Sequence, residues 1–307
     1  MLHSAKTKGY LALTATSLIW GITWVVSKIG VRELPPLQMA YIRQFIAGTI
    51  FVCFLAFFKK LPLPTLKQFR WLFVMAIVMF VSANGLSTWG VQYIPAGLGS
   101  LIGALYPLSV VVLEKVFFKS RPLTAITIVG LLLGISGIAM VSYENAFHQN
   151  GPHFLLGVLL SFTAMLSWSI GTIFMARNKV EINPYYGVGW QMLISSAILF
   201  CIMHVTKPVI PFLEISTKAW LVISFLVLFG SLLTFIAFIY SMKVLPTAVA
   251  SLYAYINPFV AMVAAFILLN EKLSLNILWG SIVTVTGVFL VNYSNKKANK
   301  IIAEVEI

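Results

Sequence analysis

The chain has 307 residues, of which 60% are hydrophobic and 9% are charged, and its mean hydropathy is +0.97. Soluble domains carry about 25% charged residues, so this composition excludes a soluble enzyme or a nucleotide-hydrolysing domain. The net charge of +13 could indicate a nucleic-acid partner, but Lys and Arg also collect in the cytoplasmic loops of membrane proteins, which is the simpler explanation.

A hydrocarbon core about 30 Å thick requires roughly 20 residues of helix for each crossing. Ten apolar runs of this length fill most of the chain, so we predict an all-α integral membrane protein with ten transmembrane helices. The predicted spans are 10–30, 36–58, 70–93, 96–118, 124–143, 154–177, 184–206, 219–243, 247–269 and 274–293.

The last five spans repeat the layout of the first five at offsets of 148 to 151 positions. The matching residues are Trp20 with Trp168, Pro36 with Pro184, Cys53 with Cys201, Pro95 with Pro246, Ser100 with Ser251, Pro107 with Pro258, Gly130 with Gly280, Gly137 with Gly287 and Tyr143 with Tyr293. Five crossings in each half insert the second half upside down, as in many solute carriers. We therefore expect a single membrane domain made of two inverted five-helix repeats, residues 1–145 and 146–307, around a central cavity.

The distribution of basic residues predicts the orientation. With a cytoplasmic N-terminus, fifteen Lys and Arg residues fall in inner segments, whereas the outer segments hold only Lys28, Arg32, Lys207, Lys218 and Lys272. This bias predicts that both termini are cytoplasmic. The short tails fit a bacterial inner (plasma) membrane better than an organelle.

The first and sixth spans each carry a tryptophan near mid-membrane, away from the interface where tryptophan is usual. Trp20 and Trp24 share a helical face with Ser17 and Ser27, and Trp168 follows Ser161 on the sixth span. Each indole N–H requires an acceptor, which a cavity wall or a neighbouring helix could supply. Both interpretations stay open.

Arg43 is the only basic residue well inside a predicted span, and the equivalent position of the second half is Gln191. It is a candidate contact for an anionic group of the solute, or a gating partner. The alternative is an arginine that snorkels to the interface or bridges helices.

The third span carries Asn84, Thr88 and Gln92 at four-residue intervals, with Trp89 alongside. A buried amide exposed to lipid would cost several kcal/mol, so we expect Asn84 to face the bundle interior or water. In the eighth span Tyr240 occupies the position equivalent to Trp89.

The fourth and ninth spans share small residues and a proline. Gly103 and Ala254 end small-x-x-x-small motifs, which let helix backbones approach closely. Pro107 and Pro258 lie four residues later and free these two carbonyls, roughly 16 Å into the bilayer. Interrupted helices at this depth bind solute in carriers, although a proline kink can also only shape packing. The flanking polar residues are Tyr106, Tyr253, Tyr255 and Asn257.

Several reactive groups are absent from the sequence. The chain has no Asp, no Glu falls at mid-membrane, and the four histidines lie near predicted span ends or the N-terminus. We therefore expect no metal site, no cofactor and no coupling to an ion gradient through a buried carboxylate.

The chain resembles an EamA-type member of the drug/metabolite transporter superfamily over nearly its whole length. The resemblance lies in Trp20-Gly21, the run 41–45 after Pro36, the paired Pro-x4-Ser-x6-Pro blocks, and the run 268–274 followed by Gly280. It implies ten helices, two inverted repeats, and export or exchange of small metabolites such as amino acids, or of toxic amphipathic compounds, by alternating access. Small multidrug members of the superfamily use a glutamate in the first span, which this chain lacks.

By position, the resemblance implies that the cavity is walled by spans one, three, four, six, eight and nine. The implied substrate-binding residues are Trp20, Trp24, Asn84, Trp89, Tyr106, Trp168, Tyr240, Tyr253 and Asn257. The partners we expect are a small-molecule solute and the lipid bilayer, with no nucleic acid.

Two alternative functions remain. A sugar-phosphate or nucleotide-sugar exchanger of the same superfamily would need Lys or Arg around a desolvated phosphate, and spans eight and nine offer only Lys243 at the inner edge. A membrane-embedded enzyme would need acidic metal ligands or a histidine nucleophile, which the spans lack.

Overall fold

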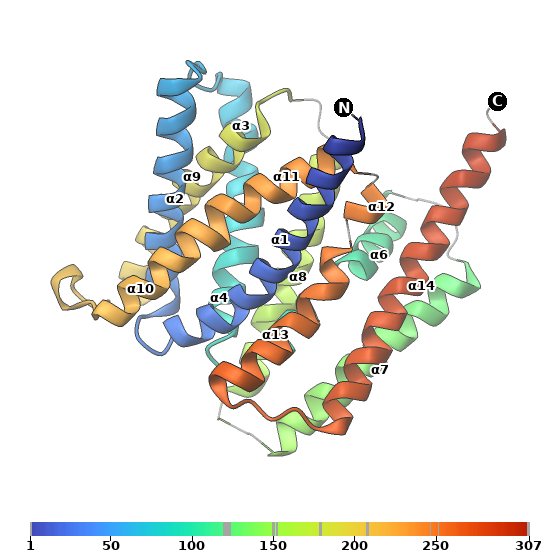
Figure 1. The fold of residues 1–307 in the computed structure, drawn as a ribbon. Helices are drawn as coiled ribbons and strands as arrows, with labels where there is room; N and C mark the ends of the chain where they lie inside the picture. Colours follow the sequence, from blue (N-terminus) through green and yellow to red (C-terminus); the bar gives the residue numbers. More distant parts are fainter. Residues whose placement is uncertain are drawn as a thin grey trace.

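A computed structural model describes residues 2–118, 124–148, 151, 153–177, 180–206, 209–245, 247–250 and 252–305 (Figure 1). The described residues form helices and no strand, which confirms the all-α fold class. Nine helical segments in this part of the chain are long and apolar enough to cross a membrane, and Tyr253–Leu269 is a shorter tenth. Pro246, Ser251, Lys119, Arg121, Lys179 and Lys207 lie outside the described residues.

In chain order the helices are α1 (Leu2–Gly30), α2 (Pro36–Phe58), α3 (Leu66–Met75), η1 (Ala76–Gly85), α4 (Leu86–Gly90), α5 (Ala96–Gly103), α6 (Tyr106–Phe118), α7 (Ala125–His148), α8 (Phe154–Arg177), α9 (Pro184–Thr206), η2 (Phe212–Glu214), α10 (Thr217–Phe225), η3 (Leu226–Leu233), α11 (Thr234–Val244), α12 (Thr247–Ala250), α13 (Tyr253–Leu269) and α14 (Leu275–Val305). The third predicted span is the continuous rod α3–η1–α4, and the eighth is α10–η3–α11. The fourth comprises α5 and α6, and the ninth α12 and α13.

Local sequence explains where several helices begin. Pro36 starts α2, a position where its missing N–H costs no hydrogen bond. Thr65 and Gln68 form a capping box at the start of α3, and Ser216 caps α10 through the Ala219 N–H. These polar caps begin the helices a few residues before the predicted spans at 70 and 219.

Helices of the two halves pack against each other reciprocally. α1 contacts α11 and α13, while its counterpart α8 contacts η1, α4 and α6. The equivalent helices α2 and α9 contact each other, as do α7 and α14. The start of α1 and the end of α14 lie at one end of the bundle, called here the terminal end, at the top of Figure 1. Helices of the first half thus have the counterparts of their own neighbours as partners in the second half.

The third helix of each half contains a π-helical segment at the same repeat position, since η1 begins at Ala76 and η3 at Leu226. π-Helical segments are rare and frequently mark functional sites. Here each presents a carbonyl to a side chain of α2: Gln44 Nε2 donates to the Phe80 carbonyl at 3.2 Å, and Arg43 Nη2 donates to the Gly230 carbonyl at 3.3 Å.

The two proline-containing spans break at different points. In the first half the helix is interrupted between Gly103 and Tyr106, so Pro107 falls in the first turn of α6. In the second half α13 starts at Tyr253 and runs through Pro258. Pro107 therefore directly follows the start of α6, whereas Pro258 lies well inside α13. The symmetry between the two halves is only approximate at this point.

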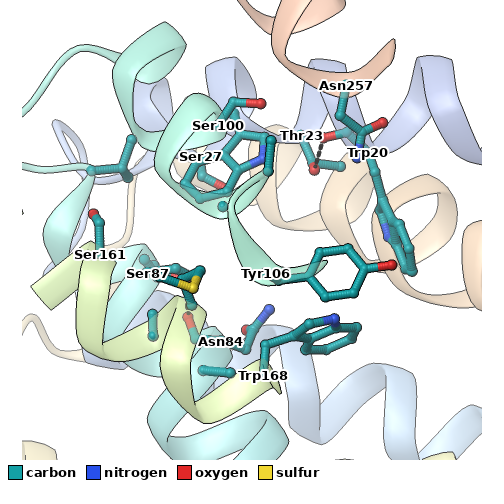
Figure 2. Close-up of a pocket in the computed structure, with 18 of the residues that line it drawn as sticks. Trp20, Thr23, Ser27, Asn84, Ser87, Ser100, Tyr106, Ser161, Trp168 and Asn257 are labelled. Atoms are coloured by element: carbon teal, nitrogen blue, oxygen red, sulfur yellow. Dashed lines mark hydrogen bonds between the residues drawn. The ribbon is translucent and has the colours of Figure 1, made fainter. Parts of the chain in front are cut away.

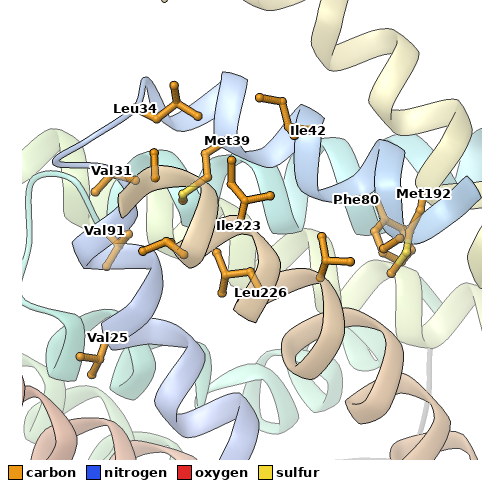
Figure 3. Close-up of a cluster of buried hydrophobic side chains, with 14 of the residues drawn as sticks. Val25, Val31, Leu34, Met39, Ile42, Phe80, Val91, Met192, Ile223 and Leu226 are labelled. Carbon is orange, nitrogen blue, oxygen red and sulfur yellow. The ribbon is translucent and has the colours of Figure 1, made fainter. Parts of the chain in front are cut away.

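A cluster of buried apolar side chains fills the region between α1, α2, α10 and η3, towards the end of the bundle away from the termini (Figure 3). Val25, Met39, Ile42, Ile223 and Leu226 are each at most 2% exposed. This packing fixes α2 against the second half and so positions the residues that face inward next to it.

Candidate central cavity

A cavity of about 190 Å³ lies between the two halves. A single water molecule requires only about 15 Å³, so the space admits a small solute. The lining residues are Trp20, Thr23, Trp24, Ser27, Arg43, Ala83, Asn84, Ser87, Thr88, Val91, Ser100, Gly103, Ala104, Tyr106, Ser161, Ala164, Met165, Trp168, Phe235, Tyr253, Ala254 and Asn257. Because α1 contributes its last third and α8 its first two thirds, the cavity lies mainly in the half of the bundle away from the terminal end.

One side of the cavity is rich in hydroxyl groups. Figure 2 shows Ser100 and Ser161 there, with Ser27 and Ser87 nearby. Ser100 and Ser161 are each 2% exposed, and neither hydroxyl oxygen has a hydrogen-bond partner among the described residues. Buried hydroxyls are normally paired, so these two are available to a solute or to water.

The other side of the cavity is aromatic. The Trp20 and Trp168 rings meet edge to face with centroids 6.4 Å apart (Figure 2). The Tyr106 and Tyr253 rings stack with centroids 6.2 Å apart. The ring centroids of Trp20 and Tyr253 are 5.3 Å apart. Trp20 Nε1 donates a hydrogen bond to the Gly230 carbonyl at 3.2 Å. The acceptor that its indole required is therefore a backbone carbonyl of η3.

Aromatic residues of α11 pack against Trp20, a residue of the cavity wall. Phe235 and Phe238 contact Trp20 with ring centroids 5.5 and 5.1 Å away. Their repeat equivalents are Asn84 and Ser87, which face the cavity. The equivalent helix positions are thus polar in the first half and aromatic in the second, so the two halves give the cavity walls of different chemistry.

The glycine motif of α5 contacts a side chain rather than another backbone. A Cβ atom on Gly99 would lie 2.9 Å from Trp24, and one on Gly103 would lie 3.2 Å from the same indole. The fourth and ninth helices do contact each other, and they do so beside this motif, where Gly97 of α5 lies against Met262 of α13. Gly103 and Ala254 both line the cavity, and the absence of a side chain at Gly103 leaves space for the Trp24 indole in the cavity wall.

Arg43 both bridges helices and lines the cavity. It is 8% exposed, so it does not snorkel, and its Nε donates to Ser231 Oγ at 2.9 Å. Its Nη2 shares the Gly230 carbonyl with Trp20. Neighbouring Gln44 binds Asn84 Oδ1 at 3.1 Å and accepts a hydrogen bond from Ser195, which joins α2 to the third helix and to α9.

Most of the residues singled out in the sequence come together in this cavity. Trp20, Trp24, Asn84, Tyr106, Trp168, Tyr253 and Asn257 all line it. In the amide orientation that pairs its nitrogen with acceptors, Asn257 donates to the carbonyls of Ser17 on α1 and Tyr253 at 2.7 and 3.1 Å, which fixes this side chain against the first helix.

Trp89 and Tyr240 do not line the cavity. Trp89 packs against Leu37 and Leu199, and Tyr240 is half-buried on α11. Each lies five residues after a lining residue, Asn84 or Phe235, which is about 140° further around a helix. Pro107 and Pro258 also lie outside the lining, next to Tyr106 and Asn257.

The sequence reasoning missed several small lining residues. Thr23, Ser87 and Val91 were not singled out, although Thr23 and Ser87 fall three residues after Trp20 and Asn84, and Val91 falls seven residues after Asn84. This helical spacing was the available signal.

Two charged residues hold the turn between α4 and α5, at the end of the bundle away from the termini. Lys28 Nζ donates to the carbonyls of Val91, Gln92 and Ile94 at 2.8, 3.0 and 2.9 Å. The Glu271 carboxylate accepts from the first N–H groups of α5, at Ala96 and Gly97. At the same end of the bundle, Lys218 Nζ forms a salt bridge with Glu33 Oε1 at 2.8 Å. The hydrogen bond from Lys218 lowers the pKa of Glu33.

Comparison with known proteins gives a consistent result. The uncharacterized transporter YvbV of Bacillus subtilis is 30% identical over 96% of this chain and 95% of its own length. The uncharacterized inner membrane transporter YedA of Escherichia coli K12 is 30% identical over 86% of this chain and 83% of its own length. A solved crystal structure covers 94% of this chain, and 97% of its own, with a TM-score of 0.63 at 17% identity, which shows a shared fold. Residues 7–143 and 155–293 each match the EamA-like transporter family, to which this multi-pass membrane protein belongs.

Proposed function

We propose that the protein exports or exchanges small metabolites such as amino acids, or amphipathic drug-like compounds, by alternating access of the central cavity. The observation that carries this proposal is the two-sided lining, with unpaired hydroxyls of Ser100 and Ser161 on one side and the rings of Trp20, Trp168 and Tyr253 on the other. A solute with one apolar and one polar part would satisfy both sides.

The approximate symmetry of the halves supports alternating access. We propose that Phe235 and Phe238, which pack against Trp20, close the cavity towards the terminal end in this state, whereas the equivalent positions of the first half carry the polar lining residues Asn84 and Ser87. Movement of one repeat, 1–145, against the other, 146–307, would open the closed side in the complementary state. We propose that the terminal end is cytoplasmic and that the membrane is the bacterial inner membrane.

Family membership places the chain among transporters rather than enzymes. Within transporters, the alternative of a sugar-phosphate or nucleotide-sugar exchanger is less well supported. Among the described residues, Arg43 is the one cation that lines the cavity, and Lys28 already uses its three donors on backbone carbonyls. A phosphate dianion would find only one positive charge.

Competition transport tests the proposal. Purified protein in proteoliposomes would be assayed for uptake of labelled phenylalanine against a panel of amino acids and tetraphenylphosphonium. We expect saturable uptake whose competitor ranking changes in Trp168→Ala and not in Trp279→Ala, which removes a tryptophan that is 59% exposed on α14. Absence of uptake for every panel solute would contradict the proposed function, and an identical ranking in Trp168→Ala would remove the aromatic side from solute recognition.

A further inference from the structure

We propose that the solute carries a single negative charge, a carboxylate, that pairs with Arg43 inside the cavity. This inference rests on the proposed transport function and specifies its substrate class. It is carried by the position of Arg43, its hydrogen bonds and its lack of a counter-ion.

Arg43 is a buried cation without an acidic partner among the described residues. Its two hydrogen-bond partners are both neutral, the Ser231 hydroxyl and the Gly230 carbonyl, and its Nη1 donates to neither. The described ion pairs involve Glu114 and Glu33, which lie at helix ends or in turns. A guanidinium kept largely from water without an opposite charge is costly, and an anion that enters the cavity removes this cost.

The remaining charges around the cavity favour a monoanion over a phosphate dianion. Lys28 follows the lining residue Ser27 on α1, and its ammonium group already donates to three carbonyls in the turn after α4. Glu271 lies beside the same turn and would repel a second negative charge there. One guanidinium matches one carboxylate, which it can bind through two parallel hydrogen bonds.

The surroundings of Arg43 favour a carboxylate on an apolar body. The Gly230 carbonyl that Arg43 contacts also accepts from Trp20 Nε1, so the guanidinium and the aromatic side of the cavity lie next to each other. Ser100 and Ser161 would accept or donate a hydrogen bond at a second polar group. Arylalkyl carboxylates, including aromatic amino acids, have this arrangement of groups.

A matched set of probes tests the charge requirement on the wild-type protein. The detergent-purified protein would be titrated with 3-phenylpropionate, its neutral amide 3-phenylpropanamide, and 2-phenylethyl phosphate, with binding followed by intrinsic tryptophan fluorescence. We expect the carboxylate to bind roughly tenfold or more tightly than the amide, as a hydrogen bond between charged groups allows. Equal affinities would overturn the proposal, as would tighter binding of the phosphate or no binding of the carboxylate.

Variants then assign the preference to Arg43. Arg43→Gln introduces the residue type found at the equivalent position 191, and it should abolish the preference for the carboxylate, whereas Arg43→Lys should retain part of it. Arg32→Gln removes an exposed cation outside the cavity and should leave the preference unchanged. A preference that persists in Arg43→Gln would overturn the assignment. If the amide binds as tightly as the carboxylate, the proposed transport function is unaffected. The transport function is tested separately, by uptake of the solute panel.

Discussion

The Trp24 indole occupies the space over Gly99, where a Cβ atom would lie 2.9 Å from the ring carbon Cζ3. Contacts shorter than 3 Å do not occur for real Cβ atoms, so any side chain on Gly99 must displace the indole. The small residues of α5 thus determine where one wall of the cavity stands.

Gly99→Ala should therefore impair transport by pushing Trp24 into the cavity. We expect at least a severalfold loss of uptake with little change in the amount of protein inserted, measured in proteoliposomes of equal protein content. Gly187→Ala is the matched control, because a Cβ there meets its nearest neighbour at an ordinary 3.4 Å. Wild-type uptake by Gly99→Ala would show that the position of Trp24 is unimportant.

The prolines beside the helix breaks should affect the rate of transport. Pro258 cannot donate to the carbonyl of Ala254, a lining residue, and alanine would restore this hydrogen bond and stiffen α13. Pro107→Ala would allow α5 and α6 to join as one helix. We expect slower uptake and unchanged insertion in both variants. If both transport at the wild-type rate, the breaks play no part in the mechanism.

Lys28 should stabilise the turn between α4 and α5. Lys28→Met leaves three carbonyls without their charged donor, and a single such hydrogen bond contributes about 1.5–3 kcal/mol. We expect a lower unfolding temperature in detergent. Lys272→Met changes the same charge at an exposed position near Glu271 and should have little effect. Equal unfolding temperatures for the two variants would contradict a stabilising role for Lys28.

A proton gradient alone should drive little transport. The chain has no Asp, and the described Glu residues whose contacts are known, Glu33, Glu114 and Glu271, lie at helix ends or in turns. No buried carboxylate is therefore available in these helices to carry a proton. Imposing a pH gradient across proteoliposomes should leave the initial uptake rate unchanged within error. A clear acceleration would reveal a coupling group elsewhere.

The helix bounds were predicted best where an apolar run begins with a proline. Predicted spans 36–58 and 184–206 coincide with α2 and α9, since Pro36 and Pro184 each start a helix and the apolar run determines its length. Local arguments also indicated three lining residues: helical spacing for Trp20, the cost of burying an amide in lipid for Asn84, and the position beside Pro258 for Tyr253. These features depend on residues close together in the chain.

Features that depend on contacts between distant helices could not be predicted. The π-helical segments η1 and η3 have no turn or proline signal, and side chains of α2 bind their carbonyls. That Gly99 faces Trp24 required the relative placement of α1 and α5. Trp89 is close to Asn84 in sequence but about 140° further around the helix, and it lies outside the lining.

The central claim is that solute occupies a space between the two halves. The reaction rate of a cysteine placed in the cavity tests this claim most directly. Cys53 and Cys201, both exposed, would be replaced by alanine, and Ser161→Cys would be treated with a membrane-impermeant thiol reagent in proteoliposomes. We predict that the cysteine reacts and that the strongest competitor from the uptake panel slows this reaction, while Leu213→Cys, at a fully exposed position, reacts at a rate independent of solute. A cysteine at position 161 that reacts at the same rate with and without solute, or does not react, would contradict the account.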